Sequence, residues 1–410
     1  MKKIPFVKYT SCGNNFVIVD QTETSLLNEA EFSAFAYQAT NTNFGVGCDN
    51  LLVIQRCTDT SLNAINAERQ YWESTPESSQ AAFLFRMFEP SGEEALCCGN
   101  GLMCIANYLF DEYGIDDTKI LTEIPLSTPH VRTIGVSLEK DYVSGGCDDL
   151  TSRRLWGWAN MGTPRQAPTE LATRGLLASL SNGIDVIDEI FVKLQTRELM
   201  SYSNESELQL KGYLVFTGEP HLVIFPDQNF GNSILANAIF GNHSKDRQAD
   251  KANSFGSRFF EHVGTYINAH YKHIFPAGIN VNFARIHNEE TVENRCFERG
   301  INRETLACGT GALAVAYVVQ ELQTSKVTTI DILPHRCRWH EADACIRAEQ
   351  RDTGWYLETS PQMLFEGFYH YIPRVIRPNT GSGVVRMKGR QPSFSAISRE
   401  GTHYPQRAWL

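Results

Sequence analysis

Two stretches of this 410-residue chain resemble each other closely enough to decide its fold. They read RMFEPSGEEALCCGNG at residues 86–101 and RCFERGINRETLACGTG at residues 295–311. Each begins with the alternation typical of a strand, continues through a polar turn, and ends in Cys-Gly-x-Gly before an apolar segment with helical spacing, at 102–110 and 312–322. The repetition predicts a chain built from two homologous halves.

A second pair of matching stretches lies upstream and supports the duplication. It reads TSCGNNFVIVD at residues 10–20 and TGEPHLVIFPD at residues 217–227. Gly13 precedes Cys98 by 85 residues, and Gly218 precedes Cys308 by 90. We therefore expect an α+β fold of two pseudo-symmetric domains, each with strands wrapped around a central helix. The functional site is expected in a cleft between the domains, where the two helix starts meet.

The repeats also suggest domain boundaries. We expect an N-terminal domain at 1–127, closed by a strand at 367–373, and a C-terminal domain at 128–366. Residues 374–410 form a basic extension with a net charge of +6, which leaves −16 on the other 373 residues. This extension is interpreted either as an interaction surface for the acidic body or as a solvated, dispensable tail.

Two further segments, 56–80 and 228–274, are rich in polar residues and lack periodicity. We expect them to be surface insertions.

Charge and composition limit the possible functions. The chain has 37 Lys and Arg against 47 Asp and Glu, a net charge of −10, which argues against nucleic acid as a partner. No apolar run reaches the ~20 residues of a membrane span, and the N-terminus does not resemble a signal peptide. We expect a cytoplasmic protein that has no membrane partner. Eleven cysteines at irregular spacing favour reduced thiols over disulfides or a metal site.

The two repeated cysteines suggest a specific chemistry. A thiol at the first turn of a helix lies at the positive end of the helix dipole, which is expected to lower the pKa of Cys98 and Cys308. The N–H groups of Gly99-Asn100 and Gly309-Thr310 could hold one carboxylate between two helix starts. One sulfur would then lie on each face of Cα, so that one thiolate removes the α-proton while the other thiol delivers one.

Most cysteines in a folded chain are structural, because free Cys is among the most buried residue types. The duplicated context removes Cys98 and Cys308 from that group, whereas Cys97 is expected in the core. The cysteines interpreted as structural are Cys104, Cys147, Cys296, Cys337 and Cys345. A phosphate-binding loop is a weaker interpretation of the glycines, since the Lys-Ser/Thr of a P-loop is missing.

Several motifs together resemble diaminopimelate epimerase and its pyridoxal-independent racemase relatives, from about residue 4 to 373. They are GNNFV (13–17), GVGCDN (45–50), CGNG (98–101), GINVNF (278–283), ERG (298–300) and ACGTG (307–311). The resemblance implies a duplicated epimerase fold and a cytoplasmic, cofactor-free enzyme that acts on a small-molecule amino acid, often as a homodimer. It also implies that Cys98 and Cys308 are the acid/base pair.

The resemblance further implies the roles of other residues. His221 with Glu298 would support cysteine ionisation, although His221 could equally be a structural histidine. Backbone N–H groups would bind the α-carboxylate, and side chains would bind the rest of the substrate. These substrate-binding residues are Asn14, Asn50, Glu89, Gly99, Asn100, Glu219, Asn280, Arg299, Gly309 and Thr310.

The chain departs from the family pattern where the substrate side chain is recognised. Glu89 and Glu219 stand where the family has asparagine, and this predicts a racemase for an amino acid with a cationic side chain: Arg, Lys, Orn or His. In the alternative, Glu89 pairs with Arg299 or another arginine and does not touch the ligand. Diaminopimelate epimerase itself, a proline or hydroxyproline epimerase and a non-catalytic amino-acid-binding protein remain the other candidate functions.

Overall fold

The structure is a computed structural model that describes residues 1–138, 155–173, 178–181, 183–194, 196–200, 206–231, 234–241, 255–323 and 327–373. Residues Met1–Pro373 form one compact unit. The expected basic extension and Cys147 therefore lie outside the described residues. The domain boundary at 127/128 stays a prediction.

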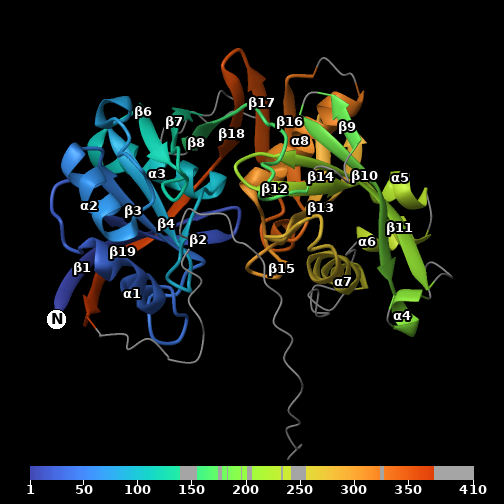
Figure 1. The fold of residues 1–410 in the computed structure, drawn as a ribbon, viewed down its shortest axis with the longest axis horizontal. Helices are drawn as coiled ribbons and strands as arrows, with labels where there is room; N and C mark the ends of the chain where they lie inside the picture. Colours follow the sequence, from blue (N-terminus) through green and yellow to red (C-terminus); the bar gives the residue numbers. More distant parts are fainter. Residues whose placement is uncertain are drawn as a thin grey trace, which may run out of the picture. The chain divides into compact units, whose positions relative to one another are not determined.

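The chain is mostly sheet, with two central helices (Figure 1). The helices are α1 (Glu29–Ala39), α2 (Asp59–Arg69), α3 (Gly99–Tyr113), α4 (Arg197–Met200), α5 (Pro226–Phe230), α6 (Ile234–Ile239), α7 (Phe255–His270) and α8 (Gly309–Gln323). The strands up to residue 193 are β1 (Lys2–Ser11), β2 (Asn14–Asp20), β3 (Asn50–Arg56), β4 (Phe83–Phe88), β5 (Glu94–Ala95), β6 (Asp117–Thr122), β7 (His130–Leu138), β8 (Leu155–Gly162), β9 (Ala178–Ser181) and β10 (Ile184–Lys193). The later strands are β11 (Glu207–Phe216), β12 (Pro220–Ile224), β13 (Asn280–Asn288), β14 (Thr291–Glu298), β15 (Arg303–Glu304), β16 (Thr329–Pro334), β17 (Ile346–Arg351), β18 (Gly354–Thr359) and β19 (Gln362–Tyr371).

Strand pairing confirms the duplicated α+β fold. From β1 to β7, skipping β5, successive strands pair antiparallel, parallel, antiparallel, parallel and antiparallel. From β11 to β17, skipping β15, the same sequence of directions recurs. We call these strands, with α3 and α8 respectively, the N-terminal repeat and the C-terminal repeat. The strands β8 and β18 pair with each other and join the two repeats into one continuous sheet.

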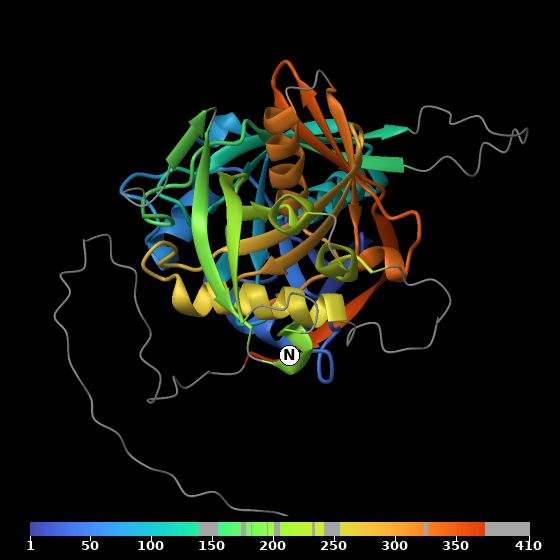
Figure 2. The ribbon, with the colours of Figure 1, turned by 90° about the vertical axis from the view of Figure 1, so that its right-hand side faces the viewer.

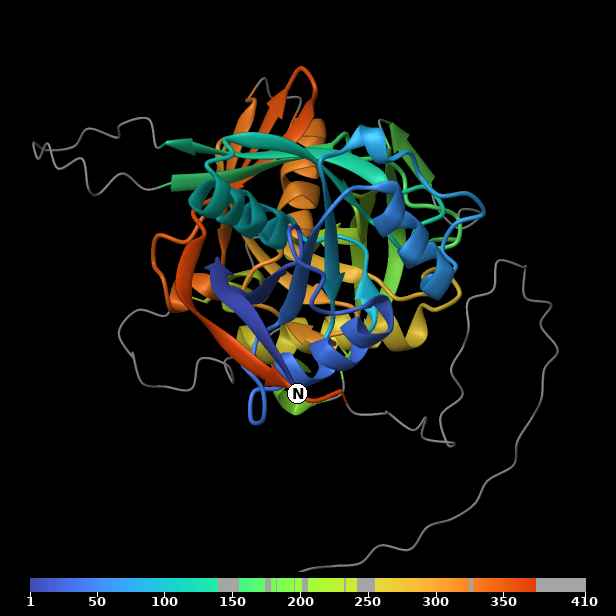
Figure 3. The same ribbon diagram turned by 90° about the vertical axis from the view of Figure 1, so that its left-hand side faces the viewer.

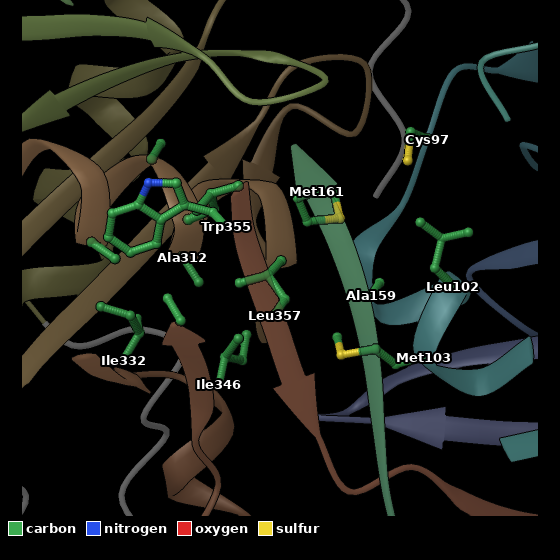
Figure 4. Close-up of a cluster of buried hydrophobic side chains, with 14 of the residues drawn as sticks. Cys97, Leu102, Met103, Ala159, Met161, Ala312, Ile332, Ile346, Trp355 and Leu357 are labelled. Atoms are coloured by element: carbon green, nitrogen blue, oxygen red, sulfur yellow. The ribbon is translucent and has the colours of Figure 1, made fainter. Parts of the chain in front are cut away.

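The two central helices begin directly after the repeated cysteines, as the sequence predicted. Strands surround α8 in Figure 2 and α3 in Figure 3. Both helices contribute to one apolar cluster that spans the two repeats. In Figure 4, β8 carries Ala159 and Met161 between Leu102 of α3 and Trp355 of β18. The positions of the two helix starts are therefore fixed by a shared core.

Each repeat contains the same buried ion pair. Arg86 donates from Nε to Glu94 Oε1 at 2.7 Å and from a terminal nitrogen to Oε2 at 2.7 Å. Arg295 does the same with Glu304, at 2.7 and 2.6 Å. Both guanidinium groups are almost fully buried, so a bidentate partner is needed to offset desolvation.

Both of the expected surface insertions contain helices. Segment 56–80 contains α2, whose Leu62 and Ile65 pack with Trp72 in a separate apolar cluster. Segment 228–274 contains α6 and α7, and α7 buries one face in a second large cluster. Within the described ranges, no helix is both long and apolar enough to cross a membrane.

Candidate active site

The two helix starts touch each other. Cys98 is the N-cap of α3, and Cys308 immediately precedes α8. A Cβ atom placed on Gly309 would lie 3.2 Å from the Cα of Gly99 and 3.2 Å from the backbone nitrogen of Asn100. Glycine at position 309 allows this close approach, which brings the starts of the two helices together. The predicted binding of a carboxylate by their N–H groups stays a prediction.

Each repeated thiol accepts a hydrogen bond from its own helix. The Gly101 N–H donates to Cys98 Sγ at 3.4 Å, and the Gly311 N–H donates to Cys308 Sγ at 3.4 Å. Burial nevertheless raises the pKa of Cys98 well above its usual value, and the Gly101 N–H only partly offsets this rise. The expected lowering of the Cys98 pKa was wrong, because the loss of solvent outweighs the helix dipole. Cys98 is therefore a thiol and a proton donor when the site is empty.

Two asparagines meet beside the helix starts. Asn100 donates from Nδ2 to Asn14 Oδ1 at 2.7 Å. Asn100 is fully buried, and its Oδ1 has no hydrogen-bond partner within the described part of the chain. A buried acceptor without a partner is costly, and a donor group on a substrate could satisfy it. Asp49 accepts hydrogen bonds from the backbone N–H and side chain of Asn15, at 2.8 and 3.0 Å, and so holds the turn that carries Asn14.

A chain of hydrogen bonds leads from His221 to Cys308. Asn282 donates from Nδ2 to His221 Nδ1 at 2.9 Å, and His221 Nε2 lies 3.0 Å from Thr310 Oγ1. Burial lowers the pKa of His221 to about 3, so the ring is neutral, and its one proton is on Nε2, facing Thr310. The Thr310 hydroxyl is then free to donate to Cys308 Sγ, 3.4 Å away. His221 is thus connected to Cys308 through Thr310.

Glu298 reaches Cys308 from another side. One carboxylate oxygen of Glu298 lies within 4.8 Å of the sulfurs of both Cys296 and Cys308. Burial raises the pKa of Glu298 to about 7; a hydrogen bond from Thr305 opposes this rise and three nearby carboxylates add to it. This group is therefore poised to hold or release a proton near neutral pH.

The three carboxylates that act on Glu298 are Glu219, Asp49 and Glu89. Glu219 forms an ion pair with Arg299, whose Nε lies 3.1 Å from Glu219 Oε2. The backbone N–H of Arg299 also donates to Asn280 Oδ1 at 2.8 Å. The structure therefore engages Arg299 with Glu219 and not with Glu89.

Glu89 has a different environment. Burial raises its pKa, and the charges of Glu93 and Glu219 raise it further, whereas Arg299 opposes them. Among the residues described, no lysine, arginine or histidine lies within ion-pair distance of Glu89. The alternative in which Glu89 forms an ion pair with an arginine is therefore not seen among the described residues, although the charge of Arg299 acts on Glu89 from a distance.

Sequence reasoning missed several residues of this site. Asn282 follows Asn280 by two positions in β13, so strand alternation could have placed both on one face. The same argument applies to Cys296, which precedes Glu298 by two positions in β14. From the sequence, Cys296 was expected to have a structural role. Asn50, which was expected among the substrate-binding residues, lies at the start of β3. Its Cα pairs there with that of Phe16 in β2.

The chain is similar in sequence to diaminopimelate epimerases. Residues 6–126 match the family model described as diaminopimelate epimerase. The chain is 26% identical over 324 residues to the diaminopimelate epimerase of Archaeoglobus fulgidus, covering 78% of this chain and 82% of that protein. It is 28% identical over 315 residues to the diaminopimelate epimerase of Acinetobacter baylyi, covering 76% and 80%. A solved structure of a hydroxyproline epimerase from Agrobacterium vitis superposes with a TM-score of 0.51 at 10% identity, covering 90% of this chain and 93% of that one, and shows the same fold.

Proposed function

Because the chain belongs to the diaminopimelate epimerase family of pyridoxal-independent racemases and epimerases and is an isomerase, we propose that it inverts Cα of an amino acid with a cationic side chain. The observation that supports the chemistry is the meeting of two cysteine-bearing helix starts at Gly99 and Gly309. The observation that supports the substrate is the engagement of Arg299 by Glu219, which leaves Glu89 unpaired.

The reaction needs two proton transfers on opposite faces of Cα. In one direction, the Cys308 thiolate takes the α-proton, while the Cys98 thiol gives its proton to the other face. The converging N–H groups of α3 and α8 stabilise the negative charge that develops on the α-carboxylate. Afterwards Cys98 is the thiolate and Cys308 the thiol, which is the arrangement that the reverse direction requires.

The hydrogen bonds around the two cysteines suit these roles. The Gly311 N–H and the Thr310 hydroxyl lie within hydrogen-bond distance of Cys308 Sγ, and both can donate to it while it carries charge during the reaction. Cys98 Sγ receives a hydrogen bond from the Gly101 N–H, and burial favours its protonated form, which is the form that donates a proton to Cα.

The substrate side chain would meet an excess of negative charge. Diaminopimelate carries a second carboxylate, which would face Glu89 and Glu219 while Arg299 is already occupied. A like-charge contact at about 4 Å costs on the order of 4 kcal/mol at an effective dielectric constant of about 20. A guanidinium, ammonium or imidazolium group would instead form charge-assisted hydrogen bonds with Glu89. Arg, Lys, Orn and His are therefore the proposed substrates.

The reaction is tested first by incubating the protein with single L-amino acids in D₂O and measuring α-deuterium by mass spectrometry. Cys98→Ala and Cys308→Ala should each abolish racemisation, since either change removes one of the two proton carriers. A non-catalytic amino-acid-binding protein would bind ligand without deuterium exchange. Full racemisation by both alanine variants would refute the two-thiol mechanism.

The substrate class is tested by comparing kcat/KM for basic L-amino acids and for L,L-diaminopimelate. Glu89→Asn should reduce kcat/KM for basic substrates by roughly 10- to 100-fold, the value of one hydrogen bond to a charged group. Glu89→Asn/Glu219→Asn should also gain activity on diaminopimelate, because Arg299 becomes free for a carboxylate. Glu77→Gln, which removes an exposed carboxylate that does not act on Glu89, is the matched control. A wild type that prefers diaminopimelate would mean that the substrate is diaminopimelate.

We also propose that the protein is a homodimer. Strand β19 pairs with β1 on one side and exposes Met363, Leu364, Phe365 and Phe368, each with 47% or more of its surface accessible. A long apolar edge strand favours association, and pairing with a second copy would cover it. Light scattering should give twice the chain mass for the wild type and the chain mass for Phe365→Lys/Phe368→Lys. A monomeric wild type would contradict the dimer.

A further inference from the structure

A third thiol lies beside one of the two catalytic thiols. Cys296, in β14, is 3% exposed, and its sulfur, the Cys308 sulfur and a Glu298 oxygen all lie within 4.8 Å of one another. Alternation along β14 places Cys296 and Glu298 on the same face of the strand. Gly311 makes room for the cluster, since a Cβ there would lie 3.3 Å from Cys296 Sγ.

The two-thiol reaction does not use Cys296. Inversion of Cα requires one sulfur on each face, and Cys98 and Cys308 supply both. The N-terminal repeat has Met87 at the position that corresponds to Cys296, so this thiol has no symmetry-related counterpart. The cluster therefore breaks the internal symmetry of the chain, and the proposed reaction does not explain why.

The ligand chemistry of the cluster is that of a thiophilic divalent cation. Zinc-class ions bind Cys thiolate at about 2.3 Å and carboxylate oxygen at about 2.1 Å, usually in tetrahedral sites. Ligand atoms around such an ion are therefore roughly 3.5 to 4 Å apart, which is compatible with the 4.8 Å limit of this cluster. Three protein ligands leave one position for water, as in zinc sites that exchange ligands.

We propose that Cys296, Glu298 and Cys308 form a binding site for a thiophilic divalent cation such as Zn²⁺, and that its occupation inhibits the enzyme. Binding displaces to solvent any protons that the two sulfurs and the Glu298 carboxyl carry, and it involves no oxidation or reduction. The bound ion holds the Cys308 sulfur as a ligand, so this sulfur cannot exchange a proton with Cα. The inhibition rests on the proposed racemase function, whereas the binding does not.

Binding is tested on the full, reduced chain by titration with Cd²⁺, whose thiolate complexes absorb in the ultraviolet. The wild type should take up one ion per chain, and affinity should fall by at least about tenfold in Cys296→Ala and Cys296→Ser, because even residues behind metal ligands contribute 10- to 100-fold. Cys57→Ala is the matched control, since Cys57 is a buried cysteine in a different apolar cluster. Circular dichroism checks that each variant is folded.

Inhibition is tested with Zn²⁺ and a chelator. Zn²⁺ should abolish wild-type racemisation reversibly, and Cys296→Ala should stay active at the same Zn²⁺ concentration. Equal Cd²⁺ affinity in the wild type and in folded Cys296→Ala or Cys296→Ser, or no uptake by the wild type, would overturn the proposal. If no amino acid is racemised at all, the Cd²⁺ titration still decides whether the site exists.

Discussion

Replacement of His221 should change how the stability of the protein depends on pH. His221 is fully buried, and burial, followed by the charge of Arg299, lowers its pKa from 6.5 to about 3. Between these two values the unfolded chain binds a proton at His221 and the native chain does not. The free energy of unfolding must therefore fall as the pH falls through this window.

The size of the effect follows from the shift. The full slope is about 1.4 kcal/mol per pH unit for one titrating group, and it is not yet complete at pH 6, so His221 alone should destabilise the native state by about 2.5 kcal/mol between pH 6 and pH 4. His221→Gln removes the titrating ring and should remove this part of the slope. At pH 7 the variant loses the ring's contacts with Asn282 and Thr310, so only the slope is diagnostic.

The measurement is urea unfolding of the wild type and His221→Gln at several pH values from 6.5 to 4. The difference in unfolding free energy between the two proteins should shrink steadily as the pH falls. His340→Gln replaces an exposed histidine and should run parallel to the wild type. Parallel curves for His221→Gln and wild type would show that His221 titrates alike in both states, and would refute the neutral ring on which the Thr310 hydrogen bond depends.

Three further changes test the contacts and segments that support the site. Gly309→Ala places a Cβ 3.2 Å from backbone atoms of the facing helix start, and should reduce kcat/KM by about 100-fold with the melting temperature little changed; an unaltered kcat/KM would contradict the carboxylate site. Arg295→Met removes the side-chain partner of the buried Glu304 carboxylate and should lower the free energy of unfolding in urea by about 3–5 kcal/mol. The double variant Arg295→Met/Glu304→Leu should recover most of this loss. A single variant as stable as the wild type would count against the importance of this pair. Truncation after Pro373 should leave melting temperature and activity unchanged, because the four apolar clusters of the described chain lie before it, and a loss of either would assign residues 374–410 a role.

The duplicated fold could be predicted because the sequence motif that marks each central helix is short and occurs twice. A Cys-Gly-x-Gly sequence before an apolar helix marks the helix start in each repeat, and the structure begins α3 and α8 at these glycines. The closing strand was also recognisable from its aromatic alternation, although β19 begins five residues earlier than expected. Motifs that contain their own turn and helix signals thus define these elements without tertiary information.

The missed helices lack such a signal. The helix α2 buries only Leu62 and Ile65, and their partner Trp72 lies beyond the C-cap Gln70, so no helical period extends far enough to be detected. The helix α7 contains Gly264, which disfavours a helix in isolation. A Cβ on Gly264 would lie 2.4 Å from the ring of Phe297, so the packing of α7 requires glycine there. Tertiary contacts decide both helices.

In the candidate site, too, some residues could be predicted from the sequence and others depend on tertiary contacts. The residues at the helix starts could be predicted from the repeats and the family resemblance. The partner of Arg299 could not, because Glu89 and Glu219 are both distant in sequence and both chemically able to pair with it. Their assignment depends on where two turns meet in space, and it determines which carboxylate is left for a substrate.

The path of the last strand has a consequence for synthesis of the protein on the ribosome. β19 lies beside β1, and Tyr371 completes an apolar cluster with Ile4 and Phe35 near the other end of the chain. The first half of the molecule therefore emerges from the ribosome long before β19. Until the second half has been translated, β1 has no β19 with which to pair. During that interval the incomplete sheet presents an open edge to other chains or to chaperones. The pairing of β1 with β19 can therefore form only after both repeats have been translated, even though most of the first repeat is made early.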